Sequence, residues 1–103
     1  MITQSISFRI AGGKNAAAMA YLRGIAERVT GHGGEDVRIL VQVGGPMGRV
    51  LLISEFSDFA AYQANRTKIM ADAEFQAQIA KAAEADLFLP GSVESALFEV
   101  AAS

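Results

Sequence analysis

The sequence has no cysteine, no tryptophan and a single histidine among its 103 residues. Without cysteine, the chain can form no disulfide framework, thiol nucleophile, zinc knuckle or iron–sulfur cluster. The one histidine, His32, cannot supply the two or three imidazoles that catalytic zinc or a facial iron triad takes from one chain. A metal held by carboxylates alone has no support in the sequence. We therefore expect neither a metal nor an organic cofactor.

The chain also lacks an excess of positive charge and any long apolar run. Lysine and arginine number 9 against 11 aspartate and glutamate, for a net charge of −2, and the basic residues are scattered. This pattern argues against a nucleic-acid partner. No apolar run approaches the roughly 20 residues of a membrane span, and residues 1–6 alternate in polarity, unlike a signal peptide. We expect a cytoplasmic protein without a membrane partner.

The chain does have a high apolar content, 51% of its residues. At this length, that content suits one core between two layers, which predicts a single domain over residues 1–103. Alternating apolar and polar residues predict a strand over 2–10, and apolar residues one turn apart predict a helix over 15–30. Further strands are expected over 36–43, 49–56 and 93–100.

Two capping signals mark the later helices. Ser57 followed by Asp58 predicts the start of a second helix, and Asp72 predicts the start of a short third one. The resulting order of main elements is strand, helix, strand, strand, helix, strand. This is the βαββαβ order of a ferredoxin-like α+β sandwich, a four-stranded antiparallel sheet with its helices on one face.

The middle hairpin is expected to be apolar on both faces. If Val43 lies opposite Arg49 across the glycine-rich turn 44–48, the helices can cover only one face, and soluble monomers seldom leave such a second face exposed. We therefore expect a homodimer in which a two-fold axis packs two sheets face to face, as a barrel with the helices outside. A register shifted by one residue would exchange the faces and leave both apolar. In the predicted register, one face has Val37, Ile39, Val41, Leu51 and Ile53, and the other has Leu40, Val50, Leu52 and Phe56.

This topology, together with the segments ISEFSDFAAY (residues 53–62) and ADAEF (residues 71–75), resembles the dimeric α/β-barrel superfamily. Within it, the chain is most similar to small NIPSNAP-like and antibiotic-biosynthesis-monooxygenase-like domains. The resemblance covers nearly the whole chain and implies the fold and dimerisation. It leaves the reaction open, because the superfamily includes cofactor-free oxygenases, haem-degrading enzymes, lactone isomerases and members without known activity. The asparagine, tryptophan and histidine set of haem-degrading members is not matched, since tryptophan is absent.

His32 is the first candidate catalytic residue, because an imidazole suits proton transfer near neutral pH. It lies among glycines over residues 31–34, where the main chain can approach a ligand closely. The alternative is an exposed loop histidine beside a helix C-terminus, where the helix dipole favours its charged form.

Tyr62 and Arg66 are the other candidate catalytic residues. At about 100° per residue, Arg66 falls on the same side of its helix as Phe59 and Met70, which is expected to be buried. There its guanidinium would bind a carboxylate or carbonyl, with the Tyr62 hydroxyl as a second donor. Alternatively, the stem of Arg66 covers the core while its charged end reaches water or Glu55.

Polar residues of the first two strands are candidates for ligand binding. Ser5, Ser7 and Arg9 share one face of the first strand, and Arg38 and Gln42 share one face of the second. If these faces line the barrel interior, they provide two cations for an anionic or polyketide-like oxygenated ligand. Alternatively, the polar face of the first strand is simply solvated near the barrel rim.

The sequence therefore predicts a homodimeric barrel that binds a small apolar or oxygenated organic molecule. Its enzymatic form would be a cofactor-independent monooxygenase-like or isomerase-like activity. The alternative is a non-catalytic, stress-associated or interaction module whose sheet face serves dimerisation only.

Overall fold

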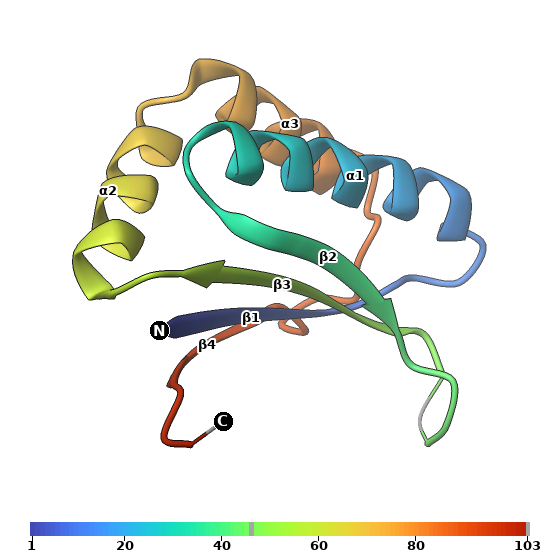
Figure 1. Cartoon of the computed structure of the whole chain (residues 1–103). Helices are drawn as coiled ribbons and strands as arrows, with labels where there is room; N and C mark the ends of the chain where they lie inside the picture. The colour runs from blue at the N-terminus through green and yellow to red at the C-terminus, as the bar shows by residue number, and fades with distance from the viewer. Residues whose placement is uncertain (46, 103) are drawn as a thin grey trace.

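The computed structural model describes residues 1–45 and 47–102; Pro46, in the predicted glycine-rich turn, lies outside them. The four strands form one antiparallel sheet in the order β2-β3-β1-β4, and the helices lie on one side of it (Figure 1). This confirms the expected ferredoxin-like α+β fold. The elements are β1 (Ile2–Arg9), α1 (Asn15–Gly31), β2 (Glu35–Val41), β3 (Arg49–Phe56), α2 (Phe59–Met70), α3 (Ala73–Glu84) and β4 (Glu94–Glu99).

Most helices and strands begin and end within one or two residues of the positions predicted from local sequence signals. Asp72 caps α3, as predicted, by accepting hydrogen bonds from the backbone N–H groups of Glu74 and Phe75. The cap of α2 is Asp58 and not Ser57, because the extended backbone of Asp58 lets its carboxylate accept from the N–H of Ala61 at 2.8 Å. Among the described residues, no helix is both long and apolar enough to cross a membrane.

The core lies between α1 and the two central strands. The predicted stripe of α1 is confirmed, since its buried residues recur at three- and four-residue spacing. They pack against Phe8 of β1 and against Val50 and Leu52 of β3. The buried stripe is Ala18, Leu22, Ile25 and Val29.

The register of β2 on β3 differs by one residue from the predicted one. Gln42, and not Val43, faces Arg49, because the Gln42 N–H donates to the Arg49 carbonyl at 3.1 Å. Ile39 consequently lies opposite Leu52, and Leu40 opposite Leu51. The predicted register was wrong because it placed Arg38 and Gln42 on the same face as the apolar residues Val50 and Leu52. In the observed register they share a face with Arg49 and Glu55 instead, which leaves the helix-facing side apolar.

The second face of the sheet is turned away from the helices (Figure 1). We call it the open face. No element among residues 1–45 and 47–102 covers it, and Leu40 and Phe98 are 44% and 56% exposed there. Ile53 is nevertheless buried, since Ser5 and Arg38 lie directly beside it on the neighbouring strands. Strand alternation places these residues on the open face: Thr3, Ser5, Ser7, Arg9, Arg38, Leu40, Arg49, Leu51, Ile53, Glu55, Glu94, Ala96 and Phe98.

Candidate functional site

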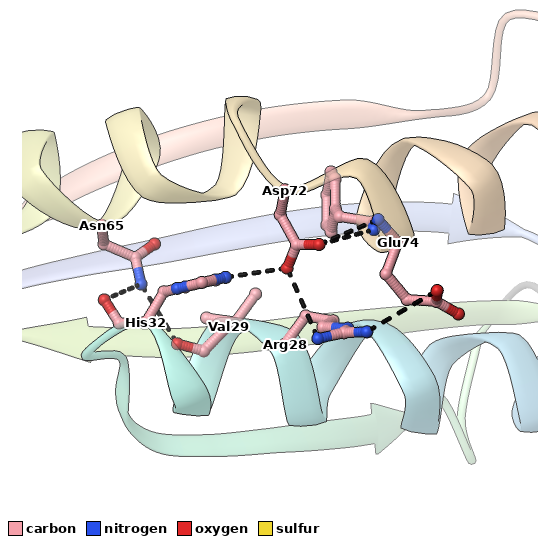
Figure 2. A network of polar contacts seen from close by, with 7 residues as sticks. Arg28, Val29, His32, Asn65, Asp72 and Glu74 are labelled. Atoms are coloured by element: carbon pink, nitrogen blue, oxygen red, sulfur yellow. Dashed lines mark hydrogen bonds and ion pairs between the residues drawn. The ribbon is translucent and has the colours of Figure 1, made fainter.

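The C-terminus of α1 meets α2 and α3 in a cluster of polar side chains (Figure 2). The last carbonyls of a helix have no partner within that helix and need donors from elsewhere. Buried Asn65 of α2 provides them, since its Nδ2 donates to the carbonyls of Val29 at 3.1 Å and His32 at 2.9 Å. The sequence analysis did not single out Asn65, although it lies three residues after Tyr62 and so on the same side of α2.

The imidazole of His32 points away from Asn65, toward the start of α3 (Figure 2). Its Nε2 lies 2.8 Å from Oδ2 of Asp72, whose other oxygen caps α3. Arg28 is 3.7 Å from the same Oδ2. The hydrogen bond with His32 is the main cause that holds the pKa of Asp72 below its ordinary value. The α3 backbone N–H groups and the charge of Arg28 lower it further against partial desolvation.

This cluster gives His32 the carboxylate partner that could not be identified in the sequence. A histidine oriented by a carboxylate is a common arrangement for a general base. In the described part of the chain, Nδ1 of His32 makes no hydrogen bond, so it is the nitrogen available for proton transfer. The same contacts also join α1 to α3, which is a structural role.

Tyr62 and Arg66 lie differently from one another on α2. Tyr62 is buried, and its ring contacts those of Phe56 and Phe59 at centroid distances of 5.5 and 5.7 Å. Arg66 is exposed, so the expectation that it lies on the buried side of the helix was wrong. The buried side follows Tyr62, Asn65 and partly buried Ile69 instead, at the three- and four-residue spacing of a helix.

The predicted ligand-binding residues lie on the sheet, and strand alternation places Ser5, Ser7, Arg9 and Arg38 together on the open face. Arg38 is neutralised, because its Nη1 contacts carboxylate oxygens of Asp36 at 2.8 Å and Glu55 at 3.2 Å.

Gln42 lies just beyond β2, at the end of the open face. Its Nε2 donates to the Gly44 carbonyl at 2.6 Å. Its buried Oε1 has no hydrogen-bond partner among the described residues.

A cavity of about 470 Å³ lies on the other side of the sheet, between β1 and α3. Three aromatic rings border it: Phe88 lies 4.8 Å from Phe8 and 5.6 Å from Tyr21, centroid to centroid. The Tyr21 phenol is protonated at neutral pH, since its ordinary pKa is about 10 and burial raises this pKa further. The lining is otherwise mostly aliphatic, from Ile6, Ile79, Ala82, Ala83, Asp86, Leu87, Leu89, Pro90 and Val93.

This cavity could not be recognised in the sequence. Its walls come from segments that are distant in the sequence, and residues 87–90 looked only like the end of a helical stretch. Tyr21 adjoins the buried stripe of α1, which is the one signal that could have indicated it. The cavity and the predicted ligand-binding residues of β1 therefore lie on opposite faces of the same strand.

The chain is similar to known proteins over nearly its whole length. A family model described as NIPSNAP matches residues 3–97. No curated protein matches the chain.

Solved structures extend the likeness to three dimensions. One is an uncharacterized NIPSNAP domain protein from Burkholderia xenovorans, with a TM-score of 0.80 and 21% identity, over 99% of this chain and 96% of that one. Protein Atu4242 from Agrobacterium tumefaciens has a TM-score of 0.78 and 24% identity, over 96% and 92%. A protein from Deinococcus radiodurans, named as a candidate antibiotic biosynthesis monooxygenase, has 0.75 and 12%, over 100% and 95%. At these identities the likeness shows the fold alone.

Proposed function

The chain belongs to the NIPSNAP family, and from that premise we propose that it binds a small, largely apolar organic molecule in the cavity between β1 and α3. The cavity itself carries the proposal: its volume of about 470 Å³ falls within the range of about 300–1,000 Å³ typical of ligand pockets. Its aromatic walls suit a flat ring, which gains from edge and face contacts with Phe8 and Phe88.

Tyr21 is the one lining residue of the cavity with a phenol hydroxyl, which we propose as its hydrogen-bonding point. Because this phenol is protonated at neutral pH, it can donate to a ligand carbonyl or accept from a ligand hydroxyl. The ligand class that fits best is therefore a neutral phenol, quinol or aromatic ketone. A charged ligand would fit poorly, since the walls offer little to replace its water.

Filling the cavity tests the proposal. Ala83 lines the cavity and Ala80 does not, although both are exposed on α3. We expect Ala83→Phe to abolish binding of neutral phenols, as measured by chemical-shift changes in ¹H–¹⁵N NMR spectra, and Ala80→Phe to leave it unchanged. Equal binding by both variants would refute the cavity as the site.

We also propose that the domain, residues 1–103, is a cytoplasmic homodimer that buries its open face against a second copy. Exposed Leu40 and Phe98 support this, because large apolar side chains left in water on a mixed polar and apolar face are better buried against a partner. No nucleic-acid or membrane partner is proposed. Native mass spectrometry beside the denatured mass is the direct test, and a monomer at micromolar concentration would contradict the dimer.

An enzymatic form of the function is a cofactor-independent monooxygenase, in line with the name of the Deinococcus radiodurans neighbour. Molecular oxygen would be the oxidant and the bound phenol or quinol the reductant. Oxygen uptake with a panel of such substrates tests this. Loss of uptake in Ala83→Phe but not in Ala80→Phe would assign it to the cavity, and no uptake from any substrate would reject it.

The alternative function is a non-catalytic, stress-associated or interaction module, favoured by the contacts of the candidate catalytic residues. His32 joins two helices and Tyr62 packs in an aromatic cluster. This alternative predicts that His32→Ala, Tyr62→Phe and Arg66→Ala change stability at most. A ligand-specific or substrate-specific loss in any of them would count against it.

A further inference from the structure

Two arginines lie directly opposite one another on the open face. The register of β1 on β3 pairs Arg9, the last residue of β1, with Arg49, the first residue of β3. In an antiparallel sheet, side chains of directly opposed residues are close neighbours, and like charges at such positions are destabilising. The Arg9 main chain is held in place, because its carbonyl accepts from Leu89 N at 2.8 Å and its N–H donates to Ser92 Oγ at 3.3 Å.

Neither guanidinium is neutralised within the part of the chain that the structure describes. The basic partners in the ion pairs formed there are Arg28, His32 and Arg38. Glu94 lies opposite Ser7, diagonally from Arg9, and makes no ion pair with it. Arg38, on the same face, has two carboxylate partners, so the lack of a counter-charge is specific to this end of the sheet.

The surroundings of Arg49 combine an apolar floor with polar groups. A hollow of about 290 Å³ adjoins it, with Leu40 and Leu51 among its walls. Gln42 borders the same hollow, and its Nε2 donates to the Gly44 carbonyl. Arg49, Leu40 and Leu51 thus line one corner, and Arg9 lies beside Arg49 on the neighbouring strand.

We propose that Arg9 and Arg49 together bind the carboxylate of an organic acid whose apolar part lies on Leu40 and Leu51. Two guanidinium groups can each donate to a carboxylate oxygen, and the anion removes their mutual repulsion. The apolar floor favours an organic acid over inorganic phosphate. This ligand differs from the neutral molecule proposed for the helix-side cavity, and the two sites lie on opposite faces of β1, so either proposal can fail without the other. In the homodimer proposed above, the ligand would lie between this corner and the second copy.

Hexanoate and its uncharged counterpart hexan-1-ol are suitable probes, in a ¹H–¹⁵N NMR titration of the full chain at low salt. We expect hexanoate to shift the amides of residues 7–9, 40–42 and 49–51, hexan-1-ol to shift them less, and added salt to weaken binding. Arg9→Gln and Arg49→Gln should each weaken hexanoate binding about tenfold. Lys68→Gln, which removes an exposed charge on α2, should bind hexanoate like the unmodified protein.

A stability measurement keeps the proposal testable apart from affinity. Without carboxylate, Arg49→Gln should raise the melting temperature, because it relieves the repulsion from Arg9, and saturating hexanoate should remove that difference. Unchanged hexanoate binding in both arginine variants would overturn the proposal. So would a weaker dimer in these variants with hexanoate binding intact, since the counter-charge would then be a carboxylate of the second copy.

Discussion

Nε2 of His32 and Oδ2 of Asp72 lie 2.8 Å apart, although 40 residues separate them in the sequence. The contact joins the end of α1 to the start of α3, and Asp72 also caps α3. One carboxylate therefore fixes both the position of a helix and the orientation of the only imidazole in the chain. Any chemistry at His32 would depend on this carboxylate.

The first prediction concerns the dependence of stability on acid. The pKa of Asp72 is lower in the folded protein than its ordinary value, so the folded state binds fewer protons than the unfolded state. Its contribution to stability is complete above the unfolded pKa of about 3.9 and is lost as the pH falls through the folded pKa. Asp72→Asn should flatten the pH dependence of the free energy of unfolding in this acidic range, as measured by urea unfolding.

Two controls accompany this measurement. Glu84→Gln, at an exposed position of α3, should leave the slope unchanged. His32→Ala should raise the pKa of Asp72 toward its ordinary value, as followed by ¹³C NMR of its carboxyl, because it removes the main cause of the lowered pKa. An Asp72 pKa that does not move in His32→Ala would contradict the assigned cause.

The second prediction concerns Asn65. Asn65→Ala removes the donor to the carbonyls of Val29 and His32, and leaving such buried groups unpaired costs about 1–3 kcal/mol. Asn65→Asp, which has the same shape but no donor, should destabilise at least as much. The exposed neighbour in Gln63→Ala should cost less than about 0.5 kcal/mol. Similar urea midpoints for Asn65→Ala and Gln63→Ala would show that the carbonyls find water instead.

The third prediction compares two glycines at the end of α1. A Cβ at Gly34 would lie 2.7 Å from Val29 Cγ1 and 2.9 Å from the Val29 carbonyl oxygen, whereas a Cβ at Gly31 would meet nothing within 4 Å. Gly34→Ala should therefore lower the melting temperature. Gly31→Ala should leave it equal or raise it, because alanine in a helix is favoured over glycine by roughly 0.5–1 kcal/mol. If Gly31→Ala lowered the melting temperature more than Gly34→Ala, the end of α1 would not have the backbone position described above.

The fourth prediction tests the open face as the dimer surface. Leu40→Lys adds a charge to this face, and Met70→Lys adds the same charge to an exposed apolar position on α2, on the helix side. Burying a lysine in a sheet interface is costly, so Leu40→Lys should dissociate the dimer in sedimentation experiments while Met70→Lys should not. A dimer that survives Leu40→Lys and dissociates with Met70→Lys would place the interface on the helices.

Much of the fold could be predicted because it rests on local periodicity. The buried stripe of α1 and the cap at Asp72 follow from spacings of a few residues, and both are confirmed. The register of β2 on β3 was predicted wrongly, because Leu40, Leu51 and Ile53 make the second face look apolar although it also has Arg38 and Arg49. Packing of Val37 and Ile39 against the α1 core selects the observed register. That choice also placed Arg49 beside Gln42 on the open face.

The residue types of the candidate sites could be predicted from the sequence, but the residues that they contact could not. His32 and Arg9 are candidates from the sequence because an imidazole suits catalysis and a cation on a polar strand face suits ligand binding. Their closest polar relationships, with Asp72 and Arg49, join segments distant in the sequence. The helix-side cavity likewise needs β1, α1 and the segment after α3 together.

By itself the sequence determined the order of the elements, the face of α1 that is buried, and the exclusion of thiol and multi-histidine metal chemistry. These depend on composition and on contacts within a few residues. Tertiary structure alone decided which face of each strand meets the helices, which carboxylate orients His32 and which two arginines lie opposite one another. Each of these is set by the packing of segments far apart in the chain, where a shift of one residue exchanges every side chain between the two faces.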